Sequence, residues 1–152
     1  MPQLIIRTAT PEDVMDLLRW RNDPHVRAMS RQNDLIDVAS HCQWYKRVLT
    51  SSDKLLLIGI LAEQSIGMVR FDRDQQSMWE ISIMLAPESR GQGISRVFLE
   101  KAICFFYTIH HEASLLAVIK KCNIASLRLF KSLNFKKTID DSEFTSHILQ
   151  SG

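Results

Sequence analysis

The chain has 152 residues, 45% of them hydrophobic, and a formal net charge of +2 at pH 7. This length suits a domain whose core needs neither disulfides nor a structural metal. The weak net charge and the short basic runs argue against a nucleic-acid partner, and no apolar run is long enough to cross a bilayer.

Helices dominate the first third of the sequence. After a β-rich stretch at 4–7, Thr10 stands as an N-cap before apolar residues at helical spacing. Pro24 ends this predicted helix, because proline interrupts the helical hydrogen bonds. The segment 25–38 has no clear period, so we expect a loop with a short helical piece there. Ser40 is expected to cap a second helix.

The hydrophobic period then changes to that of strands. The segments 54–62, 66–72 and 77–85 are rich in apolar residues and are separated by short polar turns. Segments in this arrangement predict an antiparallel meander. A loop with two glycines follows, and then a predicted helix from about 94 to 110.

The last part of the chain alternates between the two element types. It predicts a strand at 114–118, a helix at 123–133 and a hairpin of two strands at 134–138 and 144–149. The whole pattern indicates an α/β fold of the α+β type. We expect a mostly antiparallel, twisted sheet of about six or seven strands with helices flanking it.

The loop at 90–95, Arg-Gly-Gln-Gly-Ile-Ser, contains two of the five glycines in the chain. It stands between a strand and a helix, so its backbone N–H groups can converge where the helix dipole favours negative charge. A pyrophosphate fits such a loop, although a plain tight turn would use the same glycines. The lysine of a P-loop is missing, and the preceding antiparallel strands exclude a Rossmann unit.

This loop resembles the acetyl-CoA signature R/Q-x-x-G-x-G/A of the GCN5-related N-acetyltransferases (GNAT). The second half of that pattern follows at 123–135 as N-I-A-S-L-R-L-F-K-S-L-N-F, and the order of elements is similar along nearly the whole chain. Two positions depart from the family: Ser95 replaces a Gly or Ala, and Asn134 replaces a Gly. Asn adopts the left-handed conformation readily, so the turn is retained. The resemblance implies a single GNAT domain at 1–152, with a splayed central strand and acetyl-CoA as cosubstrate.

The resemblance also implies which residues hold acetyl-CoA. The backbone of the splayed strand would pair with the pantetheine arm, the loop would bind the pyrophosphate, and the helix from 123 would contact the far end of the pantetheine. The implied cofactor-binding residues are Met84, Leu85, Ala86, Arg90, Gly91, Gln92, Gly93, Ile94, Ser95, Asn123, Ser126 and Phe130.

Attack of an amine on a thioester requires the neutral amine, and only about one in two thousand alkyl amines is neutral at pH 7. Glu80 is a carboxylate in an otherwise apolar strand, on the same face as Ser82 and Met84. Family members often carry a water-linked base here, so the predicted catalytic residues are Glu80 as base and Ser82 as proton relay. The alternative for Glu80 is an ion pair with Arg70 or another cation.

Family members usually place a tyrosine in the second motif as acid for the departing thiolate, and the matching residue here is Phe130. General acid catalysis typically accelerates a reaction by a factor of about 10²–10⁴. Juxtaposition of the reactants gives effective molarities of about 10⁵–10⁸ M. Catalysis can therefore proceed without a protein acid. Tyr45 or Tyr107 could serve only if the fold brought it to the thiol.

The N-terminal third usually shapes the acceptor site in this family. The motifs W-R-N-D-P-x-V-R and H-x-x-W, with G-M-V-R-F-D and W-E-I-S-I, resemble the subfamily that acetylates UDP-linked 4-amino-4,6-dideoxy sugars in the pseudaminic acid pathway. Arginine pairs with phosphate, and an indole stacks on a base or sugar. An ordinary core tryptophan and solvated arginines would give part of the same pattern. The predicted acceptor-binding residues are Arg21, Asn22, His41 and Trp44.

Two other functions stay open on the sequence. Protein N-terminal acetyltransferases of the ribosomal-protein type share the helical N-terminal third. A non-catalytic acetyl-CoA-binding module would explain why Phe130 stands where the family usually has a tyrosine. The three cysteines form no C-x-x-C pair, no secretory signal is evident, and no His, Cys and acidic cluster has ligand spacing. We therefore expect a cytoplasmic monomer or homodimer that acts on a small-molecule amine, with no metal and no membrane or nucleic-acid partner.

Overall fold

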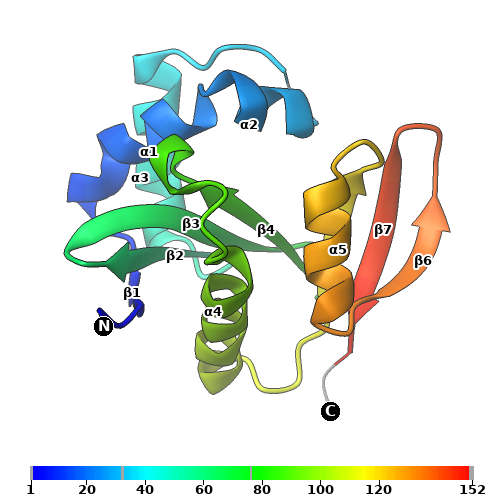
Figure 1. The fold of residues 1–152 in the computed structure, drawn as a ribbon. Coiled ribbons are helices and arrows are strands. Elements are labelled where there is room, and N and C mark those ends of the chain that lie inside the picture. The colour runs from blue at the N-terminus through cyan, green and yellow to red at the C-terminus, as the bar shows by residue number, and fades with distance from the viewer. Residues whose placement is uncertain (1, 32, 76, 151–152) are drawn as a thin grey trace.

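The computed structural model describes residues 2–31, 33–75 and 77–150. Seven strands within these ranges form one sheet in the order β1-β2-β3-β4-β5-β7-β6 (Figure 1). Every neighbouring pair is antiparallel except β4 and β5, which confirms the predicted sheet. The strands are β1 Ile5–Thr8, β2 Lys54–Leu61, β3 Gln64–Arg73, β4 Trp79–Leu85, β5 Leu115–Lys120, β6 Lys136–Asp140 and β7 Phe144–Leu149.

Helices connect the strands in the order that the sequence predicts. No helix among the described residues has the length and apolar character needed to cross a membrane. The helices are α1 Val14–Arg21, α2 Pro24–Met29, α3 Val38–Thr50, α4 Ser95–Ile109 and α5 Ile124–Ser132, with short 3-10 turns η1 Pro11–Asp13 and η2 Pro87–Ser89.

The predicted cap of α3 at Ser40 is wrong. The helix begins at Val38, and its N-cap is Asp37, whose carboxylate accepts a hydrogen bond from the Ser40 N–H at 2.8 Å. Aspartate and serine are both good caps, so the pattern alone does not choose between them. Pro24 both ends α1 and opens α2, because the first turn of a helix does not need the missing N–H.

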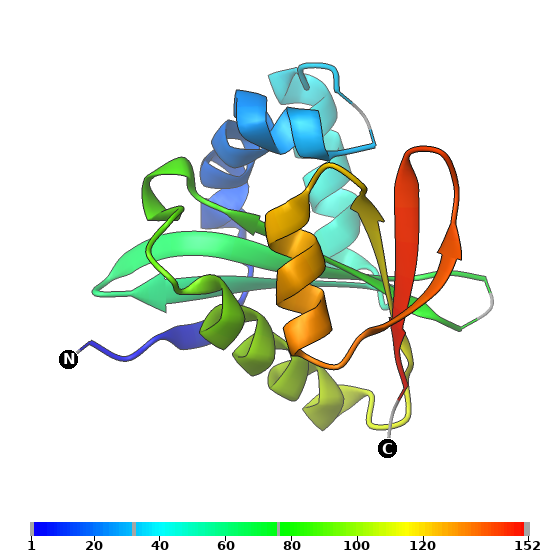
Figure 2. The same ribbon diagram turned by 45° about the vertical axis from the view of Figure 1, so that its right-hand side comes forward.

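The alternation of β3 and β4 divides the core between the two faces of the sheet. Met68 and Met84 pack with Trp20 from α1 and with residues of α3 on one face. Phe71 packs with Phe98 of α4 on the other face, which α5 also covers. Figures 1 and 2 show α4 and α5 on the opposite side of the sheet from α3. Trp20 is 1% exposed and is therefore a core residue.

Two glycines let α4 approach the sheet closely. Gly59 and Gly67 lie opposite each other in β2 and β3. A Cβ atom at Gly59 would come within 2.7 Å of the Phe98 ring, and one at Gly67 would come within 2.5 Å of the Met84 carbonyl oxygen and 3.0 Å of the same ring. Because Phe98 is fully buried, a side chain at either position would displace α4. The position of the α4 N-terminus therefore depends on these two glycines.

The strands β4 and β5 pair at only two positions, Trp79 with Leu115 and Glu80 with Leu116. Beyond Glu80 the two strands diverge, and β5 continues against β7 instead. The remaining backbone of β4, up to Leu85, borders an opening on that side. This is the splayed central strand that the family resemblance implies.

Candidate active site

A cleft of about 780 Å³ opens where β4 and β5 separate. The two strands, α5 and the loop at 90–95 border one part of it, and α1, α2 and α3 contribute to the other part. This volume is typical of sites for small molecules. Of the predicted site residues, the cleft is lined by Arg21, Trp44, Glu80, Ser82, Met84, Leu85, Arg90, Gly91, Ser95, Asn123, Ser126 and Phe130. The others, which lie outside its lining, are Asn22, His41, Ala86, Gln92, Gly93 and Ile94.

The loop at 90–95 has the geometry of an anion-binding turn. Gly91 and Gly93 have φ angles of 76° and 72°, and a Cβ atom at either would meet nothing within 4 Å. Their conformation, and not crowding, therefore requires glycine. Among the described residues, none accepts a hydrogen bond from the N–H groups of Gly93, Ile94 or Ser95. These donors stand at the N-terminus of α4, so the loop fits a pyrophosphate.

The side chain of Arg90 is used to fix this loop. Its Nη1 donates to Asp23 Oδ2 at 2.8 Å, and the same carboxylate caps α2 by accepting from the N–H groups of His25 and Val26. The Arg90 guanidinium, with the hydrogen bonds from α2, lowers the pKa of Asp23. The loop is thus tied to the helix that borders the other part of the cleft. Gln92 is exposed and donates to the Glu88 carbonyl at 3.1 Å.

The backbone of β4 at Met84 and Leu85 borders the cleft, as expected for a strand that pairs with the pantetheine arm. Ala86 differs from this expectation. Its N–H donates to the Ile66 carbonyl at 2.8 Å, its side chain is fully buried, and it does not line the cleft. Because β3 already engages the Ala86 N–H, that donor is not free for a cosubstrate, and the pairing of the Ala86 backbone with the pantetheine arm stays a prediction.

The start of α5 places polar groups at the far side of the cleft. Asn123 is the N-cap, and its Oδ1 accepts from the Ser126 N–H at 3.2 Å. Ser126 and Phe130 lie one helical turn apart and both line the cleft. Neither Tyr45 nor Tyr107 lines it: Tyr45 is 2% exposed and donates to the Thr10 carbonyl, and the Tyr107 hydroxyl is buried on α4.

Glu80 and Ser82 lie on β4 and line the cleft, on the face that carries Met84. Glu80 forms an ion pair with Arg31, with its carboxylate oxygens 3.0 and 3.1 Å from Arg31 Nη2. The side chains are 33% and 54% exposed. The alternative of a salt bridge with a cation is therefore present, but its partner is Arg31 and not Arg70. Arg70 pairs with Asp72 at 2.6 Å.

Arg21 and Arg70 face the same indole. The guanidinium carbon of Arg21 is 4.3 Å from the centroid of the Trp44 ring, and that of Arg70 is 5.5 Å from it. Burial, together with the nearby Arg70, lowers the pKa of Arg21 to about 10. In the described part of the chain, no carboxylate forms an ion pair with Arg21.

His41 lies behind Arg21. Its ring is fully buried, Nδ1 accepts from Arg21 Nη1 at 3.0 Å, and Nε2–H donates to the Val14 carbonyl at 2.7 Å. Because guanidinium only donates and a carbonyl only accepts, the two contacts fix the neutral Nε2–H tautomer. Burial lowers the pKa of His41. His41 thus positions Arg21, and the prediction of direct acceptor contact does not agree with its place in the core.

The Asn22 side chain is hydrogen-bonded to the backbone of Ile36. Its Nδ2 donates to the Ile36 carbonyl at 2.8 Å, and its Oδ1 accepts from the Ile36 N–H at 2.7 Å. These two bonds tie the segment before α3 to the end of α1. Ile36 and Asp34 of that segment line the cleft. Asn22 therefore shapes the wall of the site, although it is not itself part of that wall.

Arg70 lines the cleft, although the sequence predicted it only as a possible ion-pair partner of Glu80. The sequence pattern that places Arg70 on this face is the period-two alternation of β3. It sets Met68, Arg70 and Asp72 opposite Met84, Ser82 and Glu80 of β4. In this register Arg70 lies on the same face of the sheet as Glu80, as the predicted ion pair required. No group of three or more His, Cys, Asp or Glu side chains in the described ranges is arranged to hold a metal ion.

Comparisons with known proteins agree with this geometry. Residues 3–136 match the acetyltransferase (GNAT) domain family. No curated protein sequence matches the chain. A solved domain from Methanocaldococcus jannaschii DSM 2661 is 24% identical, with a TM-score of 0.84 and 99% of each chain covered.

Two further solved structures have named activities. Spermidine N-acetyltransferase from Vibrio cholerae, in complex with CoA and spermine, is 15% identical, with a TM-score of 0.87 over 98% of this chain and 96% of that one. N-acetyltransferase PseH from Campylobacter jejuni, in complex with acetyl coenzyme A, is 17% identical, with a TM-score of 0.77 over 99% and 100%. At these identities the structures show the shared fold.

The family match covers the splayed strand, the loop with unpartnered N–H groups and the whole of α5. The chain therefore belongs to the acetyltransferase (GNAT) domain family and is an acetyl-CoA-dependent acyltransferase.

Proposed function

We propose that the chain transfers the acetyl group of acetyl-CoA to the amino group of an anionic small molecule, a UDP-linked 4-amino-4,6-dideoxy sugar. The observation that carries the proposal is Arg21, a half-buried guanidinium at the cleft wall with no carboxylate partner in the described residues. A buried charge without a counter-ion is costly for the free protein. An anionic acceptor would supply that counter-ion.

The charges around Arg21 support the same class of acceptor. Arg70 also contacts Trp44, so two guanidiniums approach one indole, although Arg70 Nε already pairs with Asp72. Guanidinium groups bind phosphate oxygens through two parallel hydrogen bonds. The Trp44 ring, which lines the cleft, offers a flat surface for a base or a sugar. A diphosphate joined to two rings uses both features together.

A polyamine acceptor fits this end of the cleft less well. The Vibrio cholerae structure contains spermine, which is a polycation. Here the acidic lining residues are Asp34 and Glu80, and Glu80 already pairs with Arg31. A cation placed against Arg21, which has no carboxylate partner in the described residues, would be repelled in a site that is only partly solvated. The charge pattern therefore favours an anion.

Residues of the chain would orient the amine and remove its proton, while acetyl-CoA supplies the activated acetyl group. Glu80 would accept the ammonium proton once Arg31 moves aside. This movement costs little, because an exposed ion pair is worth about 0–1 kcal/mol. Ser82 lines the cleft beside Glu80 and would relay the proton. In the described part of the chain no tyrosine lines the cleft, so solvent would protonate the departing thiolate.

The test is thiol release from acetyl-CoA with two acceptors that differ only in the presence of the nucleotide. One is the UDP-linked 4-amino-4,6-dideoxyhexose, and the other is the same amino sugar without its nucleotide. If the arginines hold the diphosphate, kcat/KM should be at least about 100-fold higher with the nucleotide, which corresponds to roughly 3 kcal/mol. Equal kcat/KM for the two acceptors would show that the nucleotide is not recognised, and the proposal would fail.

A further inference from the structure

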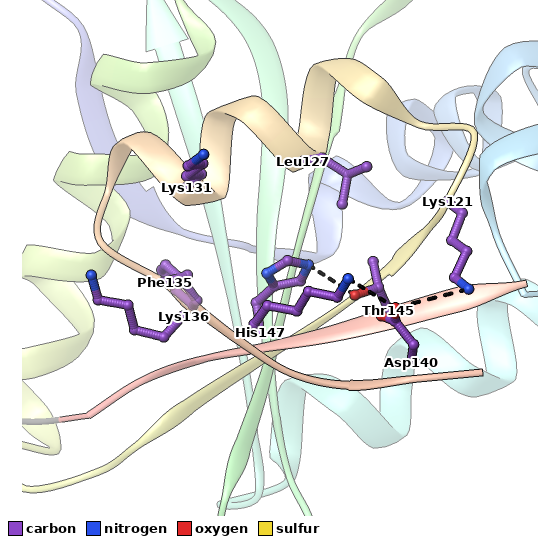
Figure 3. A pocket seen from close by; sticks show the side chains of 9 residues that line it. Lys121, Leu127, Lys131, Phe135, Lys136, Asp140, Thr145 and His147 are labelled. Carbon is purple, nitrogen blue, oxygen red and sulfur yellow. Dashed lines mark hydrogen bonds and ion pairs between the residues drawn. The ribbon is translucent and has the colours of Figure 1, made fainter.

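A second cavity, of about 700 Å³, lies between α5 and the hairpin of β6 and β7 (Figure 3). None of its lining residues lines the cleft described above. The predicted functional residues are all outside it, so the reaction leaves this cavity unexplained. It is lined by Lys121, Leu127, Lys131, Phe135, Lys136, Lys137, Asp140, Thr145 and His147.

The charges of this cavity are strongly unbalanced, with four lysines against one carboxylate. Asp140 is 2.8 Å from Lys137 Nζ and 4.0 Å from Lys121 Nζ, so it is shared by two of the lysines. In the described ranges, neither Lys131 nor Lys136 has an ion-pair partner. Ammonium groups gathered around one hollow repel each other and attract an anion with more than one charge.

The interior of the cavity combines apolar and polar groups. Leu127 and Phe135 supply apolar surface, and Phe135 is 3% exposed. Thr145 and His147 of β7 are 4% and 8% exposed, and Thr145 Oγ1 is 3.3 Å from His147 Nε2. Figure 3 shows these two side chains beside each other below α5, with Lys121 and Asp140 near one end and Lys136 near the other. A ligand with an apolar ring and an anionic group matches this lining.

Helix α5 forms a wall of both cavities. Ser126 and Phe130 line the acetyl-CoA cleft, whereas Leu127 and Lys131 line the second cavity. Both pairs are four residues apart, so each occupies one stripe of the helix surface. The two cavities therefore lie on different faces of α5, and a ligand in one leaves the other accessible.

We propose that the cavity between α5 and the β6–β7 hairpin binds a phosphate-bearing small molecule such as a nucleoside diphosphate, at the same time as acetyl-CoA occupies the cleft. Lys131 and Lys136 hold the phosphates, because their ammonium groups are not used by the protein. Leu127 and Phe135 contact the ring of the ligand.

The experiment is calorimetric titration of ADP into the full chain saturated with CoA. CoA carries its own nucleotide, so saturation blocks ADP from the cleft. The test variant is Lys131→Glu with Lys136→Glu, two exposed positions at the cavity rim. The control is Lys46→Glu with Arg47→Glu, which makes the same change of charge at two exposed positions of α3. Circular dichroism and thermal unfolding establish that both variants fold.

We expect one ADP per chain in the CoA-saturated protein, and an affinity at least about tenfold lower in the Lys131 and Lys136 variant, since each ammonium–phosphate contact is charge-assisted. The control should bind as the wild type does, and added salt should weaken binding in both. The absence of binding at millimolar ADP, its loss on saturation with CoA, or equal affinities in the two variants would each overturn the proposal.

Discussion

Replacing Arg21 with methionine is expected to weaken acceptor binding while leaving the fold at least as stable as before. Burial and the neighbouring Arg70 lower the pKa of Arg21 to about 10. Because each pKa unit corresponds to about 1.4 kcal/mol, holding the charged guanidinium there costs up to about 3 kcal/mol of folding free energy. Methionine keeps much of the contact with Trp44 but carries no charge.

Two losses offset part of this gain in stability. The Nδ1 atom of His41 loses its donor, which costs about 1 kcal/mol. The Trp44 ring loses a cation–π contact worth about 0.5–1 kcal/mol. The expected net change in the free energy of unfolding is between about zero and +1.5 kcal/mol, so the Tm should stay the same or rise by a few degrees.

Acceptor binding should change in the opposite direction. Charge-assisted hydrogen bonds contribute about 1.5–3 kcal/mol, so the KM for the nucleotide sugar should rise by about 10-fold to 150-fold in Arg21→Met. The KM for acetyl-CoA should change little. Steady-state kinetics and thermal unfolding measure both effects. Arg19→Met is the matched control, because Arg19 lies on the same helix, is half exposed and pairs with Glu88 outside the cleft.

An unchanged acceptor KM together with a Tm lowered by several degrees would refute this reasoning. Arg21 would then stabilise the packing of α1 on α3, and the uncompensated charge would not be a binding device.

Three further predictions concern the base, the positioning histidine and the loop. Glu80→Gln should lower kcat by about 10²–10⁴ at pH 7 with an unchanged KM for acetyl-CoA, and unchanged turnover would exclude Glu80 as the base. Because burial lowers the pKa of His41, below about pH 6.5 the unfolded chain binds a proton that the folded ring does not, so this contribution to stability is lost as the pH falls. Urea unfolding between about pH 7.5 and about pH 5 should therefore show a smaller loss of stability for His41→Gln than for the wild type, and equal losses would mean that His41 makes no such contribution. Gly93→Ala places a side chain at a φ of 72° with nothing within 4 Å, so it should cost about 1–2 kcal/mol of stability through backbone strain. Its KM for acetyl-CoA should rise while the acceptor KM does not, and a change confined to the acceptor KM would contradict the role of the loop.

Features that depend on a few neighbouring residues could be predicted from the sequence. The left-handed conformations of Gly91, Gly93 and Asn134, with φ angles of 76°, 72° and 72°, follow from residues that tolerate them. The order of strands and helices follows from the change of hydrophobic period, and the structure confirms it. Boundaries were less predictable, as the cap of α3 shows, because two good capping residues stand three positions apart.

The side-chain contacts of the site could not be predicted in the same way. The ion pair between Arg31 and Glu80 joins residues 49 positions apart in the sequence. The ion pair between Arg90 and Asp23 joins residues 67 positions apart. Such pairs depend on how α2 packs over the sheet, and no local period encodes that. The role of His41 was missed for the same reason, since a polar residue on a predicted helix gives no sign that its partner is Arg21.

The most direct test of the central claim is acetyl transfer by the purified protein to three acceptors of different charge. The transfer is measured as release of the CoA thiol. The acceptors are a UDP-linked 4-amino-4,6-dideoxyhexose, spermidine and an N-terminal peptide of a ribosomal protein. The account predicts rapid turnover with the nucleotide sugar alone, since Arg21 and Arg70 favour an anion. Turnover confined to spermidine or to the peptide would contradict it, because the cleft would then recognise a cation or a peptide chain.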